Sequence, residues 1–204
     1  MTFQCAECGL NYVEALADDR RKHRLYHGES VDGLQRHPLP TDVIIWRSET
    51  KRILVVTSLS SWPQRRRAQD LSLLAARDMP FSGVAYNAND APDERNLHIF
   101  IGAESLRLVA YLAFEKRTHI GRCTWPQWSA GEVRELSDHA PMWSVGVVWV
   151  CRARRRQGWV RRLLLAATSH LGVLPDHYGW FTPFSESGEA VARSLCPEVF
   201  FIAK

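Results

Sequence analysis

Short apolar runs alternate with amphipathic segments along most of the 204-residue chain. Runs rich in β-branched and aromatic residues predict strands, and they lie at Asp42–Trp46, Arg52–Thr57, Leu97–Ile101, Leu106–Glu115, Trp143–Cys151, Tyr178–Phe181 and Val199–Ile202. Helical segments, marked for example by Leu71, Leu74 and Ala75 at i, i+3 and i+4, are expected at Trp62–Asp78, Trp159–Leu171 and Ser187–Leu195. The stretch Thr118–Pro141 is expected to be irregular. Together these segments predict a mixed α and β body.

Two of the predicted strands carry additional information. Gly102–Ser105 lies between Leu97–Ile101 and Leu106–Glu115, and it predicts the turn of a hairpin. Trp143–Cys151 is apolar almost throughout, which is typical of a strand buried on both faces. This strand leads directly into an arginine-rich turn and then into a helix.

Residues 1–32 form a separate, polar head. From Asn11 to His27 the chain is polar and charged, and most of it is predicted to be helical. A loop that contains Gly28, Gly33, Pro38 and Pro40 is then expected to lead to the body. We therefore predict two domains, one at residues 1–32 and one at residues 33–204.

Four residues of the head have the spacing of a zinc site. Cys5, Cys8, His23 and His27 follow the pattern C-x2-C-x14-H-x3-H. A Cys-x-x-Cys turn presents two thiolates, and histidines at i and i+4 share a helix face, so the four ligands can close a tetrahedron. Because the head is too short to have a core, bound metal would supply its folding energy. A Cys5–Cys8 disulfide and chance proximity are the alternatives, and the spacing favours zinc.

The head is expected to have a structural or docking role. Asp18 and Asp19 lie near the start of its predicted helix, where they would repel phosphates, and only one finger is present. Nucleic-acid binding remains open as an alternative because four basic residues follow the two aspartates: Arg20, Arg21, Lys22 and Arg24.

Composition excludes several classes of protein. The chain is 46% apolar and 24% charged, which is ordinary globular usage and not that of a disordered chain. No run of about 18 apolar residues could span a membrane. The N-terminus has no signal pattern and the five cysteines are an odd number, so we expect a reducing, intracellular compartment. We expect Cys123, Cys151 and Cys196 to be free buried thiols.

The arginine-rich turn is the second candidate site. It runs from Arg154 to Arg162, where a buried strand meets a helix. Unpaired N–H groups at a helix start and the helix dipole suit a pyrophosphate, and Gly158 would let the backbone approach it closely. A solvated basic helix start is the alternative. For the other arginine cluster, Arg65–Arg67, we expect a solvated face rather than a binding role.

Several motifs together resemble one known family. The head contains C-G-x-x-Y (Cys8 to Tyr12) and H-x-x-Y-H (His23 to His27), and the strand before the basic turn ends in Val148-Trp149-Val150. Phe181 to Gly188 reads FTPFSESG, which is similar to the segment F-S-D-P-T-x-x-G. From Cys5 to the C-terminus the chain resembles the cohesion-establishment acetyltransferases, which join a C2H2 zinc finger to a GNAT-fold acetyltransferase domain.

The resemblance implies a fold, an activity and a set of residues. The fold would be α+β, a GNAT-like, mostly antiparallel sheet flanked by helices after a small C2H2 zinc finger. The activity would be direct acetyl transfer from acetyl-CoA to an amine, most simply a protein lysine, in a ternary complex. Cohesin is the family's known substrate class, and the protein would be nuclear if eukaryotic and cytoplasmic if bacterial. The residues implied in cofactor binding are Val148, Trp149, Val150, Arg155, Arg156, Gln157, Gly158, Trp159, Val160 and Ser185.

The chain departs from the family where catalysis is concerned. Pro183 stands in place of the catalytic aspartate, and Leu165 in place of an acidic residue on the helix after the cofactor turn. A base is useful because a lysine ammonium must lose a proton before it attacks. Glu186, Glu189, His170 and His177 are available, and the spacing selects none of them. A GNAT-fold binding module with weakened catalysis and a nucleic-acid-binding finger protein therefore remain as alternatives.

Overall fold

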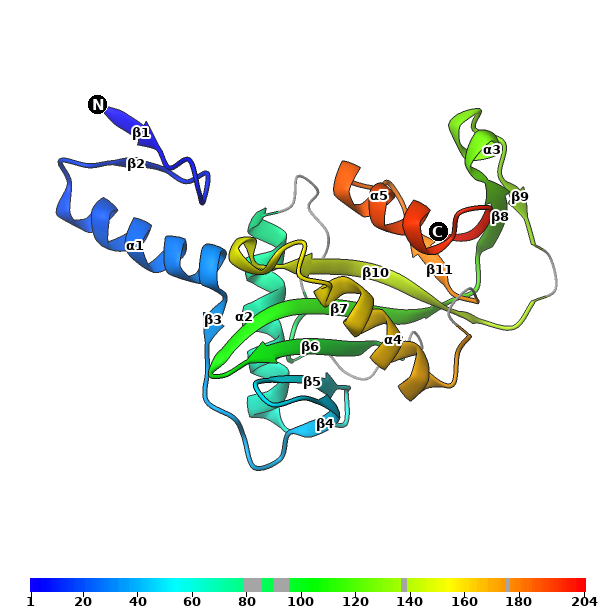
Figure 1. Cartoon of the computed structure of the whole chain (residues 1–204), viewed down its shortest axis with the longest axis horizontal. Helices are drawn as coiled ribbons and strands as arrows, with labels where there is room; N and C mark the ends of the chain where they lie inside the picture. Colours follow the sequence, from blue (N-terminus) through cyan, green and yellow to red (C-terminus); the bar gives the residue numbers. More distant parts are fainter. Residues whose placement is uncertain (79–85, 90–95, 137–138, 175–176) are drawn as a thin grey trace.

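The computed structural model describes residues 1–78, 86–89, 96–136, 139–174 and 177–204. Figure 1 shows a small N-terminal finger at one end of a broad, twisted sheet. The finger has a two-stranded antiparallel hairpin, β1 (Thr2–Gln4) and β2 (Asn11–Val13), followed by helix α1 (Ala17–Asp32). Gly33 ends α1 with φ 91°, and an added Cβ there would lie 2.4 Å from the backbone oxygen of Leu108.

The body is built on one large mixed sheet. Among the described residues its strands lie in the order β4-β5-β6-β7-β10-β11-β12-β8-β9, with the short β3 also paired to β7. Their bounds are β3 (Leu34–Gln35), β4 (Val43–Arg47), β5 (Lys51–Val56), β6 (His98–Glu104), β7 (Arg107–Arg117), β8 (Ile120–Thr124), β9 (Arg134–Glu135), β10 (Met142–Val150), β11 (Gly179–Phe181) and β12 (Val199–Ala203). All pairs are antiparallel except β10–β11 and β11–β12. This confirms the predicted mostly antiparallel sheet.

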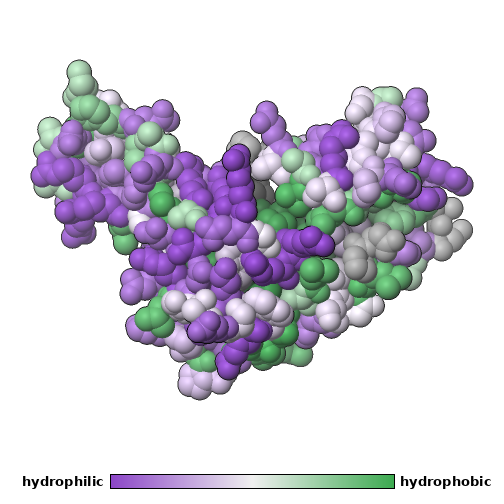
Figure 2. Space-filling view, in the orientation of Figure 1, coloured by the Kyte–Doolittle hydropathy of each residue, from purple (hydrophilic) through white to green (hydrophobic). Residues whose placement is uncertain are grey.

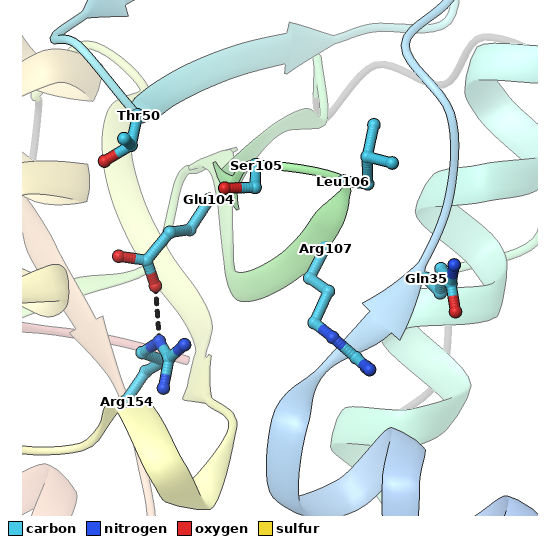
Figure 3. A pocket seen from close by; sticks show the side chains of 7 residues that line it. All are labelled: Gln35, Thr50, Glu104, Ser105, Leu106, Arg107 and Arg154. Carbon is cyan, nitrogen blue, oxygen red and sulfur yellow. Dashed lines mark hydrogen bonds and ion pairs between the residues drawn. The ribbon is translucent and has the colours of Figure 1, made fainter.

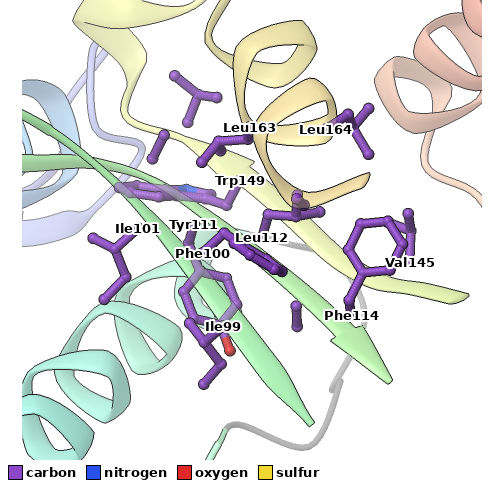
Figure 4. Packing of buried hydrophobic residues seen from close by; sticks show 14 of the residues in the cluster. Ile99, Phe100, Ile101, Tyr111, Leu112, Phe114, Val145, Trp149, Leu163 and Leu164 are labelled. Carbon is purple, nitrogen blue, oxygen red and sulfur yellow. The ribbon is translucent and has the colours of Figure 1, made fainter. Parts of the chain in front are cut away.

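Helices cover both faces of the sheet. Helix α2 (Trp62–Asp78) packs on β5 and β7, and helix α4 (Trp159–Leu171) packs on β6, β7 and β10 from the other side (Figure 1). Both helices have the bounds predicted from the sequence. Helix α5 (Glu186–Leu195) lies beside β11 and β12, and the short α3 (Trp125–Ser129) follows β8. Large apolar side chains of β6, β7, β10 and α4 fill the core (Figure 4).

The stretch Thr118–Pro141 is more ordered than predicted. It contains β8, α3 and β9, with a capping box at the start of α3, where Thr124 Oγ accepts from the Gln127 backbone and the Gln127 side chain accepts from the Thr124 N–H. The pattern of β8 was missed because Gly121 and Arg122 interrupt its apolar residues. Pairing with β12, which lies about eighty residues later in the chain, makes this segment a strand.

Two other local predictions were wrong. Asn11–Val13 is strand rather than helix, because it pairs with Thr2–Gln4 to support the Cys-x-x-Cys knuckle, and α1 instead runs on to Asp32. Gly102 belongs to β6 and not to the hairpin turn. An added Cβ on Gly102 would lie 2.7 Å from the ring of Trp159, so glycine is needed there to admit the tryptophan.

Candidate cofactor cleft and metal centre

Strands β10 and β11 separate soon after they meet. They pair in parallel only at Ser144↔Gly179 and Val145↔Trp180. Beyond this point β11 pairs only with β12, and the part of β10 from Val147 to Val150, which the structure describes completely, pairs only with β7. One edge of β10 therefore carries unpaired backbone groups that an extended ligand can meet by hydrogen bonding.

A β-bulge lies at the point of separation. The register of β10 against β7 shifts between Val145 and Val147, which leaves Gly146 as the extra residue. A bulge bends its strand and redirects neighbouring groups. Figure 2 shows the surface hollowed between the basic turn and α5, with apolar side chains in the hollow. The bulge and the strand separation thus open a cleft toward the start of α4.

The turn at the mouth of this cleft is suited to an anion. Arg156 and Gly158 adopt positive φ angles of 61° and 77°, and Gly158 is the N-cap of α4. No side chain caps this helix start, and its first turn holds no acidic residue but does hold Arg161 and Arg162. Cations at a helix N-terminus oppose the dipole. The arrangement is therefore unfavourable without a bound anion and favourable with one.

Two of the three turn arginines are already paired within the protein. Arg154 donates to Glu104, beside an open cavity of about 480 Å³ near the β6–β7 turn (Figure 3). Arg155 donates to Asp78 and to the Val150 carbonyl oxygen, the latter at 3.1 Å. The Arg156 side chain is exposed and has no hydrogen bond or ion pair with any described residue. Of the three, Arg156 has the guanidinium that is available to a ligand.

The other residues implied in cofactor binding lie in different environments. The Trp159 residue is 2% exposed and its ring packs against Gly102 of β6, so its backbone N–H is the group that can donate to a ligand. Ser185 Oγ accepts from the Gly188 N–H at 3.1 Å as the N-cap of α5. Gln157 is exposed, and its side-chain amide donates to the Ala153 carbonyl oxygen. Val148, Val150 and Val160 flank the cleft from β10 and α4, and Trp149 donates from its indole to Asp78.

Asp78 is a residue that the sequence did not single out. Its side chain is only 3% exposed and accepts from Trp149 Nε1 at 3.0 Å, from Arg152 at 2.7 Å and from Arg155. Arg152, in the short helix η1 (Arg152–Arg154), also donates to the backbone oxygen of Glu7 in the finger. Asp78 and Arg152 therefore connect the finger, the end of α2 and the cofactor turn. The sole sequence signal was an acid at the C-terminal end of a helix, where the dipole disfavours it.

The Cys/His residues of the finger lie together. Ligand atoms of Cys5, Cys8, His23 and His27 are all within 4.8 Å of one another. Cys5 Sγ is 3.4 Å from His27 Nδ1, and the knuckle is closed by a 2.8 Å bond from the Gly9 N–H to the Cys5 carbonyl oxygen. The Cys8 backbone N–H lowers the pKa of the Cys5 thiol to about 6, whereas burial raises that of Cys8.

These residues fit a zinc ion. His23 Nε2 is buried and has no hydrogen-bond partner in the described part of the chain, as expected for an atom whose partner is a metal. Tyr12 stacks on the His23 ring with centroids 4.0 Å apart, which holds the ring in place. Glu7 Oε2 lies 3.1 Å from His27 Nε2, so a carboxylate orients the second histidine. Two thiols and two imidazoles are the donor set of structural zinc sites.

The candidate bases from the sequence are scattered. Glu189 pairs with Arg193 on α5, and Glu186 is exposed in the first turn of that helix. His170 lies near the C-terminal end of α4 and contacts the rings of His98 and Phe100. His177 precedes β11 and lies 6.4 Å from the Phe201 ring centroid. Pro183 and Leu165 are both exposed.

The cluster Arg65–Arg67 does not form a solvated face. Arg67 is 5% exposed and pairs with the equally buried carboxylate of Asp42. Arg65 donates to the Ala88 carbonyl oxygen at 2.6 Å, and Arg66 pairs with Asp70 one helical turn away. The expectation was wrong because the partner of Arg67 is Asp42, which directly precedes β4 and lies 25 positions earlier in the chain. By contrast, Cys123, Cys151 and Cys196 are buried thiols that form no disulfide within the described part of the chain, as predicted.

Comparison with known proteins gives a consistent result. No protein-family model matches the chain. The chain is 24% identical over 225 residues to N-acetyltransferase ECO1 of Candida glabrata, which covers 93% of this chain and 82% of that protein. Its fold is similar to that of the xEco2 acetyltransferase domain bound to a K105-CoA conjugate, with a TM-score of 0.63 and 16% identity over 79% of this chain and 97% of that one.

A second structure of the xEco2 acetyltransferase domain also has a TM-score of 0.63, with 17% identity over 82% of this chain and 98% of that one. These similarities confirm the resemblance to cohesion-establishment acetyltransferases and the expected fold. Among the described residues, no helix is both long and apolar enough to cross a bilayer.

Proposed function

We propose that this protein is an acetyl-CoA-dependent N-acetyltransferase that acts on an amine, with a protein lysine as the acceptor. The observation that carries the proposal is the separation of β10 from β11 beside an uncapped, basic helix start. Similarity to N-acetyltransferase ECO1 and to an acetyltransferase domain bound to a CoA conjugate supports the same activity.

The cleft supplies each part of acetyl-CoA with a partner. The pyrophosphate would accept hydrogen bonds from backbone N–H groups at the start of α4, with Arg156 as an additional cation. The pantetheine arm would lie along the free edge of β10 at Val147–Val150 and bond to its backbone. The thioester would then lie near the bulge at Gly146. Catalysis would consist mainly of holding thioester and amine in contact, with backbone N–H groups stabilising the oxyanion.

The finger would serve this body as a zinc-stabilised module. Cys5, Cys8, His23 and His27 would hold the ion, which supplies folding energy rather than chemistry at the cleft. We accordingly divide the chain into a finger at residues 1–32 and a GNAT-like domain at residues 33–204. Nucleic-acid binding is disfavoured because Arg66, Arg67, Arg154 and Arg155 are neutralised by acidic side chains of the same chain.

A calorimetric titration of the zinc-loaded protein with acetyl-CoA tests the proposal. We expect micromolar binding that Gly158→Asp abolishes, because an aspartate there brings both a strained φ and a negative charge to the phosphate site. Gly131→Asp is the matched control, since Gly131 has φ 76° and open space around it but lies beyond α3, at the other edge of the sheet. Absence of binding by the wild-type protein would overturn the proposal.

Turnover separates an enzyme from a binding module. The resemblance to the cohesion-establishment acetyltransferases implies acidic residues where this chain has Pro183 and Leu165, so binding alone does not establish activity. Release of free CoA in the presence of lysine-containing peptides would establish acetyl transfer. Binding without release in a broad screen of amines would favour the module with weakened catalysis.

A further inference from the structure

Glu115 lies next to the point where the two cleft strands separate. It is the opposite partner of Ser144 in the β7–β10 register, and Ser144 is the first residue of β10 that pairs with β11. Its neighbour Phe114 pairs with Val145, on the face covered by α4. Because successive strand residues point to opposite faces, Glu115 belongs to the other face of the sheet. Glu115 is therefore a largely buried acid, 9% exposed, on the face of the sheet opposite to helix α4.

The bulge gives this carboxylate access to the cleft. A Cβ added to Gly146 would lie 3.5 Å from Glu115 Oε1, so the carboxylate extends over the bulged backbone of β10. Only a hydrogen occupies that position in glycine, which leaves the oxygen close to the place where the thioester would lie. The departures at Pro183 and Leu165 do not concern this strand.

A cation of the chain itself already binds this carboxylate. Arg117 donates from Nε to Glu115 Oε1 at 3.0 Å, and its guanidinium carbon lies 4.4 Å from the ring centroid of Phe181 on β11. The Arg117 side chain thus reaches from β7 across β10 to β11. A carboxylate together with an aromatic face is a combination that binds primary ammonium groups as well as guanidinium groups.

We propose that Glu115 is the carboxylate that receives the acceptor ammonium and takes up its proton; this assignment rests on the proposed acetyltransferase activity. Arg117 and Phe181 then complete the acceptor side of the cleft, with Arg117 as a positioning residue for the carboxylate. The base is then a residue of β7, and not one of the positions at which the related family has its acidic residues.

The chemical step is balanced as follows. The acceptor ammonium gives one proton to Glu115, and the freed nitrogen lone pair forms a C–N bond with the thioester carbonyl carbon. The C–S bond breaks, and the CoA sulfur leaves as a thiolate that takes the second proton lost by the nitrogen. The product amide keeps one N–H, and Glu115 returns its proton to solvent.

Two CoA thioethers of equal shape test the assignment without a known acceptor. S-(2-aminoethyl)-CoA carries a primary ammonium close to the position of the attacking nitrogen, and S-propyl-CoA carries a methyl group there. We expect the zinc-loaded wild-type protein to bind the ammonium compound about tenfold more tightly or better, because a charged hydrogen bond forms in a partly desolvated site. Glu115→Gln is expected to abolish that preference, whereas the affinity for S-propyl-CoA stays within about twofold.

The control is Glu135→Gln, the same change at an exposed carboxylate on the edge strand β9, which is expected to keep the full preference. If Glu115→Gln does not fold, Glu115→Asp is used instead. Its side chain is one methylene shorter, so we expect the preference for S-(2-aminoethyl)-CoA to fall several-fold. An unchanged preference in the folded variants, or equal affinities in the wild type, would overturn the assignment of Glu115 alone. Failure of the wild type to bind either compound or acetyl-CoA would instead overturn the proposed function.

Discussion

The finger and the body are stabilised in different ways. Cys8 is the only buried apolar residue of the finger, residues 1–32, all of which the structure describes. The body buries a continuous core on both faces of its sheet, including Phe100, Phe114 and Leu112 at 0% exposure. Burial of apolar area can therefore account for the folding of the body but not for that of the finger. The difference implies that metal and core can be removed separately.

The two parts nevertheless share a polar connection. Asp78, itself in the body, binds Arg152, and Arg152 binds the finger backbone at Glu7. The same carboxylate binds Arg155 of the cofactor turn. A change in the finger can thus reach the cleft through two arginines and one carboxylate.

Removal of the metal is expected to have the largest effect on stability, and to unfold only the finger. Structural zinc sites contribute about 10 kcal/mol or more to folding, and nothing else in the finger is of that size. Chelation, or Cys8→Ser, is expected to remove hydrogen-exchange protection from α1 and the β1–β2 hairpin while β6 and β7 stay protected. Cys123→Ser, at a buried thiol of the body, should leave the zinc content at one ion per chain. Protection of α1 in a metal-free sample would contradict this assignment.

Truncation of the core is expected to destabilise the body and spare the finger. Phe100→Ala removes a fully buried ring that packs edge-on against Phe114, and we expect a loss of about 3–5 kcal/mol in the free energy of unfolding. Denaturant titration followed by tryptophan fluorescence measures the loss, and zinc content below the transition reports on the finger. If the variant lost its zinc under native conditions, the two parts would not be independent.

Neutralising Asp78 is expected to have the smallest effect on stability. Its specific effect is expected on the dependence of acetyl-CoA binding on zinc. Asp78→Asn weakens the charged bonds to Arg152 and Arg155, at a cost of about 1–3 kcal/mol. In the wild type, we expect zinc removal to weaken acetyl-CoA binding several-fold, because the knuckle no longer holds Arg152. In the variant, zinc removal should have little further effect.

Asp70→Asn is the matched control for that cycle, since Asp70 lies on the same helix and pairs with Arg36 and Arg66 away from the finger. The acetyl-CoA affinity is measured by calorimetry with and without zinc, for the wild type and for both variants. Equal zinc dependence in the wild type and in Asp78→Asn would show that the coupling does not pass through this carboxylate.

Local patterns predicted the elements whose signals are contained in their own residues. Helices α2 and α4 have the expected bounds because an amphipathic period is a local feature, and α4 is in addition flanked by Gly158 and Gly172. The Cys/His spacing is local as well, and the four side chains do meet. Strand β8 was missed because a strand with a central glycine and arginine is defined by its partner, β12.

The remaining parts of the site depend on tertiary contacts. Arg155 is among the residues that the family resemblance implies in cofactor binding, yet it is engaged by Asp78, a residue 77 positions away. Trp159 follows the phosphate turn, yet its ring packs against Gly102 of β6. Glu115 follows the apolar run of β7 and belongs to no motif; its place beside the bulge follows from the pairing of β7 with β10. Spacing in the sequence carries no information about such contacts.

Because β10 and β11 pair at only two positions, hydrogen exchange along the free part of β10 can measure how much cofactor is bound. Amides of Val147–Val150 that do not donate to β7 face an open edge, so deuterium enters them at nearly the rate of a frayed strand. A ligand that lies along that edge takes the place of the absent strand and slows the labelling. Isotope uptake by the amides on that open edge thus reports, without any added dye or product assay, what fraction of the molecules hold their cofactor.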